Sequence, residues 1–265
     1  MTAGCWVILS DRRSRRIQTR IMSSPRRRGS PVKQFSPRHS AGAFCFIFVY
    51  MKRLLIIVLL LALSFATDAF CGILIDSRDG QSYRTVKIGN QEWMAENLNY
   101  EMANSYCSPS NCTKYGRLYT WAAAMDSAGS WSMNGKGCGY GKTCSPTYPV
   151  RGVCPTGWHL PTMAEFETLF TAVGGSSTAG TKLKSTTGWN SGGNGTDAYS
   201  FSALPAGSRY NYKDYSSEGN FAFFWSSSEN GSNIAYFMGL YYSYDHAYLN
   251  YHYKDNGLSV RCIKD

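Results

Sequence analysis

The sequence lacks the short motifs that mark the common metal and hydrolase sites. It has no C-x2-C pair, and His159, His246 and His252 are not grouped with cysteines at the spacing of a zinc site. It has neither an H-E-x-x-H nor a G-x-S-x-G motif, the patterns of zinc peptidases and α/β-hydrolases. No apolar run reaches the roughly 20 residues that a membrane-spanning helix needs. These absences favour a non-catalytic protein without metal or other cofactor, and without a membrane span in its mature form.

Acidic residues are scarce at the start of the chain. The 265 residues carry 27 Lys and Arg against 17 Asp and Glu, and the net charge of +10 would by itself suggest a nucleic-acid or anionic-membrane binder. However, residues 1–53 hold 12 of these bases and one acid, whereas residues 54–265 hold 15 bases and 16 acids. The working domain is therefore expected to be nearly neutral, and nucleic acid is not an expected partner.

A secretory signal peptide is predicted at residues 51–69. Met51-Lys52-Arg53 forms a short positively charged segment, and an uncharged, apolar run of 13 residues follows over 54–66. Small residues suited to a cleavage site come next. Cleavage after Ala66 or Ala69 would give a secreted or cell-surface protein.

Residues 1–50 are interpreted as lying upstream of the true translation start at Met51, because the predicted signal peptide is complete from that residue. A long basic extension of the signal is the alternative. A lipid anchor at Cys71 is not favoured, since the bulky Phe70 precedes it where a small residue is needed.

Six cysteines lie in the expected mature domain, and an even number in an exported chain indicates disulfides. Two pairs bracket short segments with Gly, Pro or Ser turns, and the remaining two cysteines lie far apart in the chain. The predicted disulfides are Cys107–Cys112, Cys138–Cys144 and Cys154–Cys262. The last would close the longest loop and stabilise the fold by about 4–5 kcal/mol in the chain-entropy model.

One α+β domain is predicted over residues 73–265, with helices early and strands late. A hairpin is expected at Gly89-Asn90, and a helix is expected from Thr162, which forms a capping box with Glu165. Gly, Ser, Thr and Asn predict a long loop over 174–198. Strands are expected at 221–226, 234–242, 247–253 and 258–263.

Several sequence blocks together resemble a known domain family. In chain order they are 90–100 (NQEWMAENLNY), 115–124 (YGRLYTWAAA), 153–162 (VCPTGWHLPT), 201–207 (FSALPAG), 224–228 (FWSSS) and 259–262 (SVRC). In that order they resemble the Fibrobacter succinogenes major paralogous domain (FISUMP), over nearly the whole mature chain. This family is distantly similar to the C-type-lectin-like fold of formylglycine-generating enzymes. The resemblance implies two short helices with a twisted antiparallel sheet, long loops and disulfides, and it supports Cys154–Cys262.

The usual sites of these distant relatives are missing. Neither a Glu-Pro-Asn or Gln-Pro-Asp loop nor a Trp-Asn-Asp strand occurs, so calcium-dependent sugar chelation is not expected. The reactive cysteine pair of formylglycine-generating enzymes is not expected either, because only Cys262 follows Cys154.

Tyrosine is abundant in the second half, with 11 tyrosines over 199–253. Tyrosine is typical of recognition surfaces, although it also suits half-buried strands. Strand alternation would place Tyr242 and Tyr244 on one face and Tyr241 on the other. The candidate ligand-binding residues are Trp189, Tyr210, Tyr212, Tyr215, Tyr242 and Tyr244. We expect an exported, non-catalytic binding or surface-display domain that recognises polysaccharide or a cell-surface component, with a secreted enzyme built on the long loops as the alternative.

Overall fold

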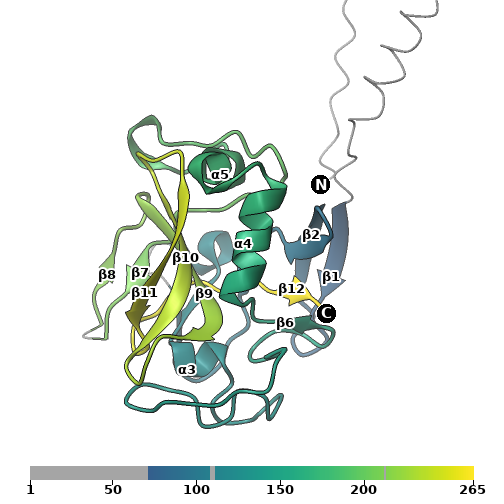
Figure 1. Cartoon of the computed structure of the whole chain (residues 1–265), viewed down its shortest axis with the longest axis vertical. Coiled ribbons are helices and arrows are strands. Elements are labelled where there is room, and N and C mark those ends of the chain that lie inside the picture. The colour runs from purple at the N-terminus through teal and green to yellow at the C-terminus, as the bar shows by residue number, and fades with distance from the viewer. Residues whose placement is uncertain (1–70, 108–110, 212) are drawn as a thin grey trace, which may run out of the picture. The chain divides into compact units, whose positions relative to one another are not determined.

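The structure is a computed structural model that describes residues 71–265 apart from 108–110 and Tyr212, and without the side chain of Cys71 (Figure 1). The predicted signal peptide and the residues before it therefore lie outside the described residues. The described part is mixed, with a few short helices and sheets that are mostly antiparallel.

The larger sheet has five strands in the order β1-β2-β3-β12-β6, and every pair of neighbours is antiparallel. The predicted hairpin turn at Gly89-Asn90 joins β2 to β3, and the φ of +60° at Gly89 suits a residue without Cβ. Ile263 pairs with both Trp93 and His159, so the C-terminal strand joins segments that are far apart in sequence. The strands are β1 (Cys71–Ile75), β2 (Ser82–Ile88), β3 (Gln91–Met94), β6 (Trp158–His159) and β12 (Ile263–Lys264).

The smaller sheet has three antiparallel strands in the order β11-β10-β9. Three of the four strands predicted late in the chain are confirmed as β9 (Phe221–Glu229), β10 (Ile234–Tyr241) and β11 (Ala247–Tyr253). The strand expected over 258–263 is wrong, because β12 includes only its last residue. In the rest of that segment, only Leu258 and Ser259 form single bridges, to Tyr119 and Phe224.

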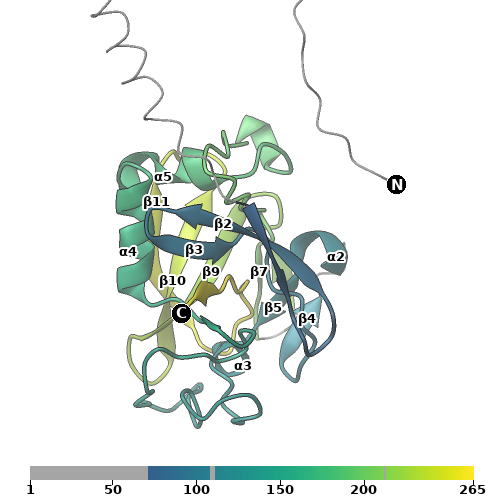
Figure 2. The same ribbon diagram turned by 90° about the vertical axis from the view of Figure 1, so that its right-hand side faces the viewer.

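Helix α4 (Met163–Ala172) begins at the predicted capping box. Thr162 Oγ1 accepts a hydrogen bond from Glu165 N at 3.2 Å, and the Glu165 carboxylate accepts one from Thr162 N at 2.7 Å. Phe166 on the buried side stacks on Trp93 of β3 with ring centroids 5.5 Å apart, and the same side packs on β9 and β10. Helix α4 therefore lies between the two sheets in Figure 1, and in the turned view of Figure 2 it lies along one side of them.

Helix α5 (Ser176–Leu183) occupies part of the segment that was predicted as a long loop, so that prediction is wrong. Its Gly, Ser and Thr residues have weak helix propensity, but Ala179 and Leu183 are fully buried in the core. Gly180 allows a close approach, because an added Cβ would lie 2.5 Å from the carbonyl oxygen of His246. Tertiary packing therefore stabilises a helix that local propensity does not favour.

The core of the described residues has two large clusters on opposite faces of the three-stranded sheet and a small third one of Tyr115, Leu118 and Ala206. Trp225 and Phe224 of β9 belong to different clusters, because successive strand side chains point to opposite faces. Trp225 Nε1 donates to the carbonyl of Tyr119 at 2.7 Å, so this buried indole is satisfied. The remaining elements are short: β4 (Ser105–Cys107), α2 (Cys112–Tyr115), β5 (Arg117–Tyr119), α3 (Trp121–Ala124), a 3-10 turn (Asn190–Gly192), β7 (Ser208–Arg209) and β8 (Tyr215–Ser216).

Two of the three predicted disulfides are present, Cys138–Cys144 and Cys154–Cys262. Cys107 and Cys112 are free thiols, so the predicted bridge between them is not formed. The Cys112 thiol instead donates to Asn99 Oδ1 at 3.0 Å. Burial, with the neighbouring Cys107, raises the pKa of Cys112 to about 11, which keeps it in the unreactive protonated form.

Candidate functional site

The turn between β10 and β11 carries the densest group of tyrosines. Tyr241 ends β10, and its ring centroid lies 4.6 Å from that of Tyr242 and 4.7 Å from that of Tyr244. It also stacks on Phe221 at 4.2 Å. The expectation that Tyr241 points away from the other two is wrong, because residues 242–246 form a turn in which strand alternation does not apply. We call Tyr241, Tyr242 and Tyr244 the tyrosine turn.

The tyrosine turn is one end of a longer aromatic band. From Tyr244, ring contacts continue through His246, Tyr248, Phe237 and His252 to Tyr210, with neighbouring centroids 4.7–6.2 Å apart. Strand register places Phe237, Tyr248 and His252 on one face of the smaller sheet. Tyr244 and His246 are exposed, whereas Phe237 is buried. We define the aromatic band as Tyr210, Phe237, Tyr241, Tyr242, Tyr244, His246, Tyr248 and His252.

A buried lysine holds the tyrosine turn in place. Lys184 is only 3% exposed, and its Nζ donates to the carbonyls of Tyr241, Tyr242 and Tyr244 at 3.2, 3.3 and 3.0 Å. Burial lowers the pKa of Lys184, yet three carbonyl dipoles solvate its ammonium group. Thr181 of α5 adds two hydrogen bonds to Asp245, from N at 3.0 Å and from Oγ1 at 2.7 Å. The exposed rings are therefore carried by a fixed backbone, which lowers the entropic cost of binding a ligand.

Trp189 was predicted to be an exposed ligand platform, and this is wrong. The side chain is 5% exposed, and Nε1 donates to Ser185 Oγ and to the carbonyl of Ala203, both at 3.1 Å. The Gly-rich composition around Trp189 suggested a solvent-exposed loop, but the segment folds so that the indole packs in the core. Lys184 Nζ lies 5.3 Å from the Trp189 ring, so Trp189 supports the tyrosine turn indirectly.

The predicted site residue Tyr212 lies outside the described residues, and the remaining predicted tyrosines lie in two separate places. Tyr210 is half-buried and belongs to the aromatic band, with its ring 6.2 Å from His252. Tyr215 of β8 is 37% exposed and lies 5.9 Å from the Arg209 guanidinium, which packs more closely over Tyr106 at 3.6 Å. The structure thus brings Tyr210, Tyr242 and Tyr244 into one band and leaves Tyr215 in a separate cation–π cluster.

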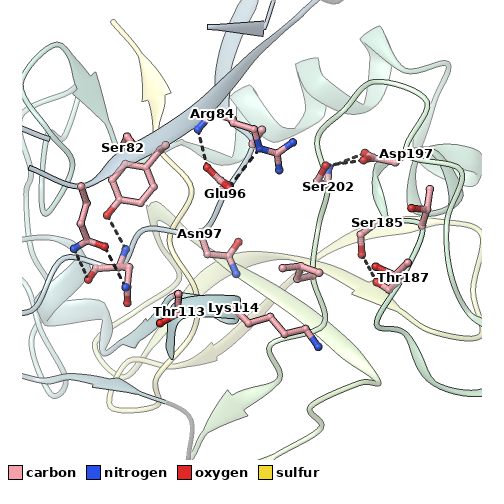
Figure 3. Close-up of a pocket in the computed structure, with 17 residues that line it drawn as sticks. Ser82, Arg84, Glu96, Asn97, Thr113, Lys114, Ser185, Thr187, Asp197 and Ser202 are labelled. Carbon is pink, nitrogen blue, oxygen red and sulfur yellow. Dashed lines mark hydrogen bonds and ion pairs between the residues drawn. The ribbon is translucent and has the colours of Figure 1, made fainter. Parts of the chain in front are cut away.

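A polar pocket of about 430 Å³ is the second candidate site, and sequence reasoning missed it. Figure 3 shows Arg84 and Glu96 on one wall, facing Asp197 and Ser202 across the opening. Glu96 accepts a hydrogen bond from Arg84 N at 2.7 Å and lies 3.4 Å from Arg84 Nε. Asp197 accepts from Ser202 N at 2.7 Å and from Ser202 Oγ at 2.6 Å. The walls come from segments about 100 residues apart, so no local motif could reveal them.

The pocket rests on a rigid, buried floor. Asn97 donates to the carbonyl of Tyr115 at 2.8 Å and accepts from Arg261 Nε at 2.8 Å. Arg261 is fully buried, and its guanidinium also donates to the carbonyls of Phe201 and Ser202. Burial lowers the pKa of Arg261 to about 9, so it remains a cation at neutral pH. This buried cation joins the last segment of the chain to both walls of the pocket.

His159 forms a separate buried contact at the C-terminus. Its Nε2 lies 2.8 Å from Glu165 Oε1, and its Nδ1 lies 2.7 Å from Asp265 Oδ1. Burial by itself lowers the pKa of His159, but the two carboxylates outweigh burial and raise it. The contact joins β6, the start of α4 and the chain end, so we assign it a structural role.

The described residues lack two kinds of feature. Among them, no group of three or more His, Cys, Asp or Glu side chains is arranged to hold a metal ion. Nor does that part of the chain contain a helix long and apolar enough to cross a membrane.

The comparisons with known proteins identify the domain family. The model of the Fibrobacter succinogenes major domain matches residues 86–264, which is most of the chain. No curated protein and no solved structure matches the chain. The family match includes the residues of both candidate sites except Gln81 to Arg84 at the edge of the pocket. The chain therefore belongs to the Fibrobacter succinogenes major domain family.

Proposed function

We propose that this chain is an exported, non-catalytic domain that binds polysaccharide through the aromatic band. The observation that carries the proposal is the tyrosine turn: three clustered tyrosines on a turn whose carbonyls are held by the buried Lys184. Burying an ammonium group costs free energy, and the three hydrogen bonds that offset this cost also fix the backbone that carries the tyrosine rings. Preorganised rings are what a binding surface requires.

The chemistry of the band suits sugar rings. The C–H faces of a pyranose ring pack on the electron-rich faces of aromatic side chains, and tyrosine adds a hydroxyl at its tip. Tyr244 and His246 stack face to face at 4.7 Å with 19° between their planes, and both side chains are exposed.

The length of the band favours a polymer over a single sugar. Six rings follow one another from Tyr244 to Tyr210 across the smaller sheet, and all of them except the buried Phe237 are at least partly exposed. Residues 54–265 carry 15 bases and 16 acids, so a neutral polysaccharide is favoured over a strongly charged one.

A non-catalytic role is supported by the lack of recognised hydrolase motifs, because the sequence has neither an H-E-x-x-H nor a G-x-S-x-G motif. The export of the domain rests on the predicted signal at 51–69.

We also propose that the fold is C-type-lectin-like. The Cys154–Cys262 bond supports this, because it joins a segment just before β6 and α4 to the segment that leads into the last strand.

Retention on insoluble polysaccharides tests the binding proposal. Purified protein is mixed with cellulose, xylan, mannan and chitin, and bound protein is measured against Tyr244→Ala. The matched control is Tyr251→Ala, because Tyr251 is 54% exposed on β11 but lies on the opposite face from Tyr248 and His252. We expect retention on at least one polymer, an affinity loss of tenfold or more in Tyr244→Ala, and little change in Tyr251→Ala.

The proposal is wrong if the protein stays in the supernatant with all four polymers. It is also wrong if Tyr251→Ala abolishes retention while Tyr244→Ala leaves it intact, since binding would then use the other face of the sheet.

A further inference from the structure

We propose that the polar pocket is a second, separate binding site, which takes a small, neutral, hydroxyl-rich ligand such as one or two sugar units at a chain end. Its volume of about 430 Å³ lies within the range of about 300–1,000 Å³ that is usual for small-molecule sites. None of its lining residues belongs to the aromatic band, so this site does not depend on the function proposed for the band.

The charges that line the pocket are balanced. Arg84 and Lys114 supply two positive groups, and Glu96 and Asp197 supply two negative groups. Arg84 pairs with Glu96, while Lys114 Nζ donates to Tyr115 Oη at 2.8 Å and lies 4.5 Å from the Tyr115 ring. An anionic or cationic ligand would therefore meet no excess of opposite charge, whereas a neutral ligand would not be penalised.

The polar groups of the pocket are fixed before any ligand arrives. A hydrogen bond from Arg84 N orients the Glu96 carboxylate. Hydrogen bonds from Ser202 N and Oγ orient the Asp197 carboxylate. Each carboxylate oxygen has more than one lone pair, so these groups can still accept hydrogen bonds from ligand hydroxyls. Figure 3 shows the two carboxylates on opposite sides of the opening, which lets one compact ligand contact both.

Exposed hydroxyls complete the lining. Ser82 lies on the β2 wall, and Thr186 and Thr187 lie on the opposite wall. A hydroxyl both donates and accepts, as does every hydroxyl of a sugar. Tyr83 and Leu204 add apolar surface for the C–H faces of a ring. Balanced charge, fixed acceptors, free hydroxyls and a small apolar area together favour a saccharide over an ion or a peptide.

An NMR titration of the purified, isotope-labelled protein tests this site. The probes are cellotetraose, xylotetraose and mannotetraose as neutral ligands, and tetragalacturonate as the anionic comparison. We expect at least one neutral probe to shift the backbone amide signals of Arg84 and Ser202 on opposite walls, with a smaller effect from tetragalacturonate. Tyr244→Ala should leave these pocket shifts unchanged, which separates this site from the aromatic band.

Two variants probe the pocket itself. Glu96→Gln keeps the shape of the side chain but removes its charge, and Thr187→Val removes a hydroxyl; each should weaken the neutral probe about tenfold or more. The matched control is Glu101→Gln, because Glu101 is also paired with an arginine, Arg117, but its side chain is 80% exposed outside the pocket. Thermal unfolding of each variant checks that the fold is retained.

Three outcomes would overturn the proposal. The first is that no probe, up to its solubility limit, moves the pocket signals. The second is that only tetragalacturonate moves them, which would show an anion site. The third is that Glu96→Gln and Thr187→Val, both folded, bind the neutral probe as tightly as the unchanged protein.

Discussion

The aromatic band and the polar pocket differ in how the chain builds them. The tyrosine turn lies within one β-hairpin, and its rings are close because they are close in sequence. The pocket is assembled from segments around residues 81–99, 113–116 and 185–204, which meet only after folding. The comparison shows that a surface formed by one hairpin can be predicted from the residue types in that part of the sequence. A pocket formed by three distant segments cannot be predicted in this way.

Both regions nevertheless depend on a buried cation bonded to carbonyl groups. Lys184 holds the tyrosine turn, and Arg261 holds the floor of the pocket. Neither cation forms an ion pair shorter than 4.0 Å with an acid among the described residues. Backbone dipoles fix a loop by its main chain and leave the neighbouring side chains available to a ligand.

The largest effect on stability is expected from the Cys154–Cys262 disulfide, which lies in the core and belongs to neither region. Replacing Cys154 and Cys262 by alanine should lower the free energy of unfolding by about 4–5 kcal/mol, because the bond closes a loop of 108 residues. Removing Cys138–Cys144, with a separation of 6 residues, should cost about 2 kcal/mol. Urea unfolding measures both, and equal losses would contradict the loop-length argument.

Lys184→Met should separate the two regions. The change leaves three carbonyls of the tyrosine turn without their donor, so we expect a loss of about 1–3 kcal/mol in unfolding free energy and weaker polysaccharide retention. The NMR shifts of the pocket residues on addition of a neutral tetrasaccharide should persist.

Lys182→Met is the control at the same end of α5, where Lys182 lies in the last turn and Lys184 directly follows the helix, because Lys182 Nζ donates to a single carbonyl, that of Val173. If Lys182→Met and Lys184→Met reduce retention equally, the turn is not held by Lys184 in particular.

Two histidines should respond to pH in opposite directions: His252 in the aromatic band, and His159 in the buried contact at the C-terminus, outside both regions. The pKa of His159 is raised, so its stabilisation is present below the unfolded pKa of about 6.5 and is lost as pH rises through the folded pKa. Burial lowers the pKa of His252 in the aromatic band, and its Nδ1 accepts from Tyr253 N. The stability linked to His252 is therefore present above about pH 6.5 and falls as pH drops toward its lowered folded pKa.

Melting temperature measured against pH tests this difference. His159→Gln should flatten the loss on the alkaline side, and His252→Gln should flatten the loss on the acid side. A shift in the same direction for both variants would contradict the assignment.

The smallest effect concerns the thiols beside the pocket. Cys112 precedes the pocket residues Thr113 and Lys114, and burial raises its pKa to about 11. We expect slow alkylation of Cys112 by iodoacetamide at pH 8 in the folded protein and fast alkylation after denaturation. Peptide mapping that finds a Cys107–Cys112 disulfide in the native protein would contradict the structure.

Local features were the predictable part of the fold. The capping box at Thr162, the hairpin turn at Gly89 and three of the late strands each depend on hydrogen bonds or periodicity within a short segment. Helix α5 was not predictable, because its weak helix formers are held by burial of Ala179 and Leu183 against distant residues. The tyrosine-rich surface was found by composition, but Trp189 was misplaced for the same reason as α5.

The sequence alone determined the family, the near-neutral charge of residues 54–265 and two of the three cysteine pairings, since these depend on residue identity and spacing. The tertiary structure decided which tyrosines form one band, that Trp189 lies inside, and that Glu96 and Asp197 face each other across a pocket. The physical reason is that burial and convergence arise from contacts between segments distant in sequence. Hydrophobic periodicity carries no information about where those segments meet.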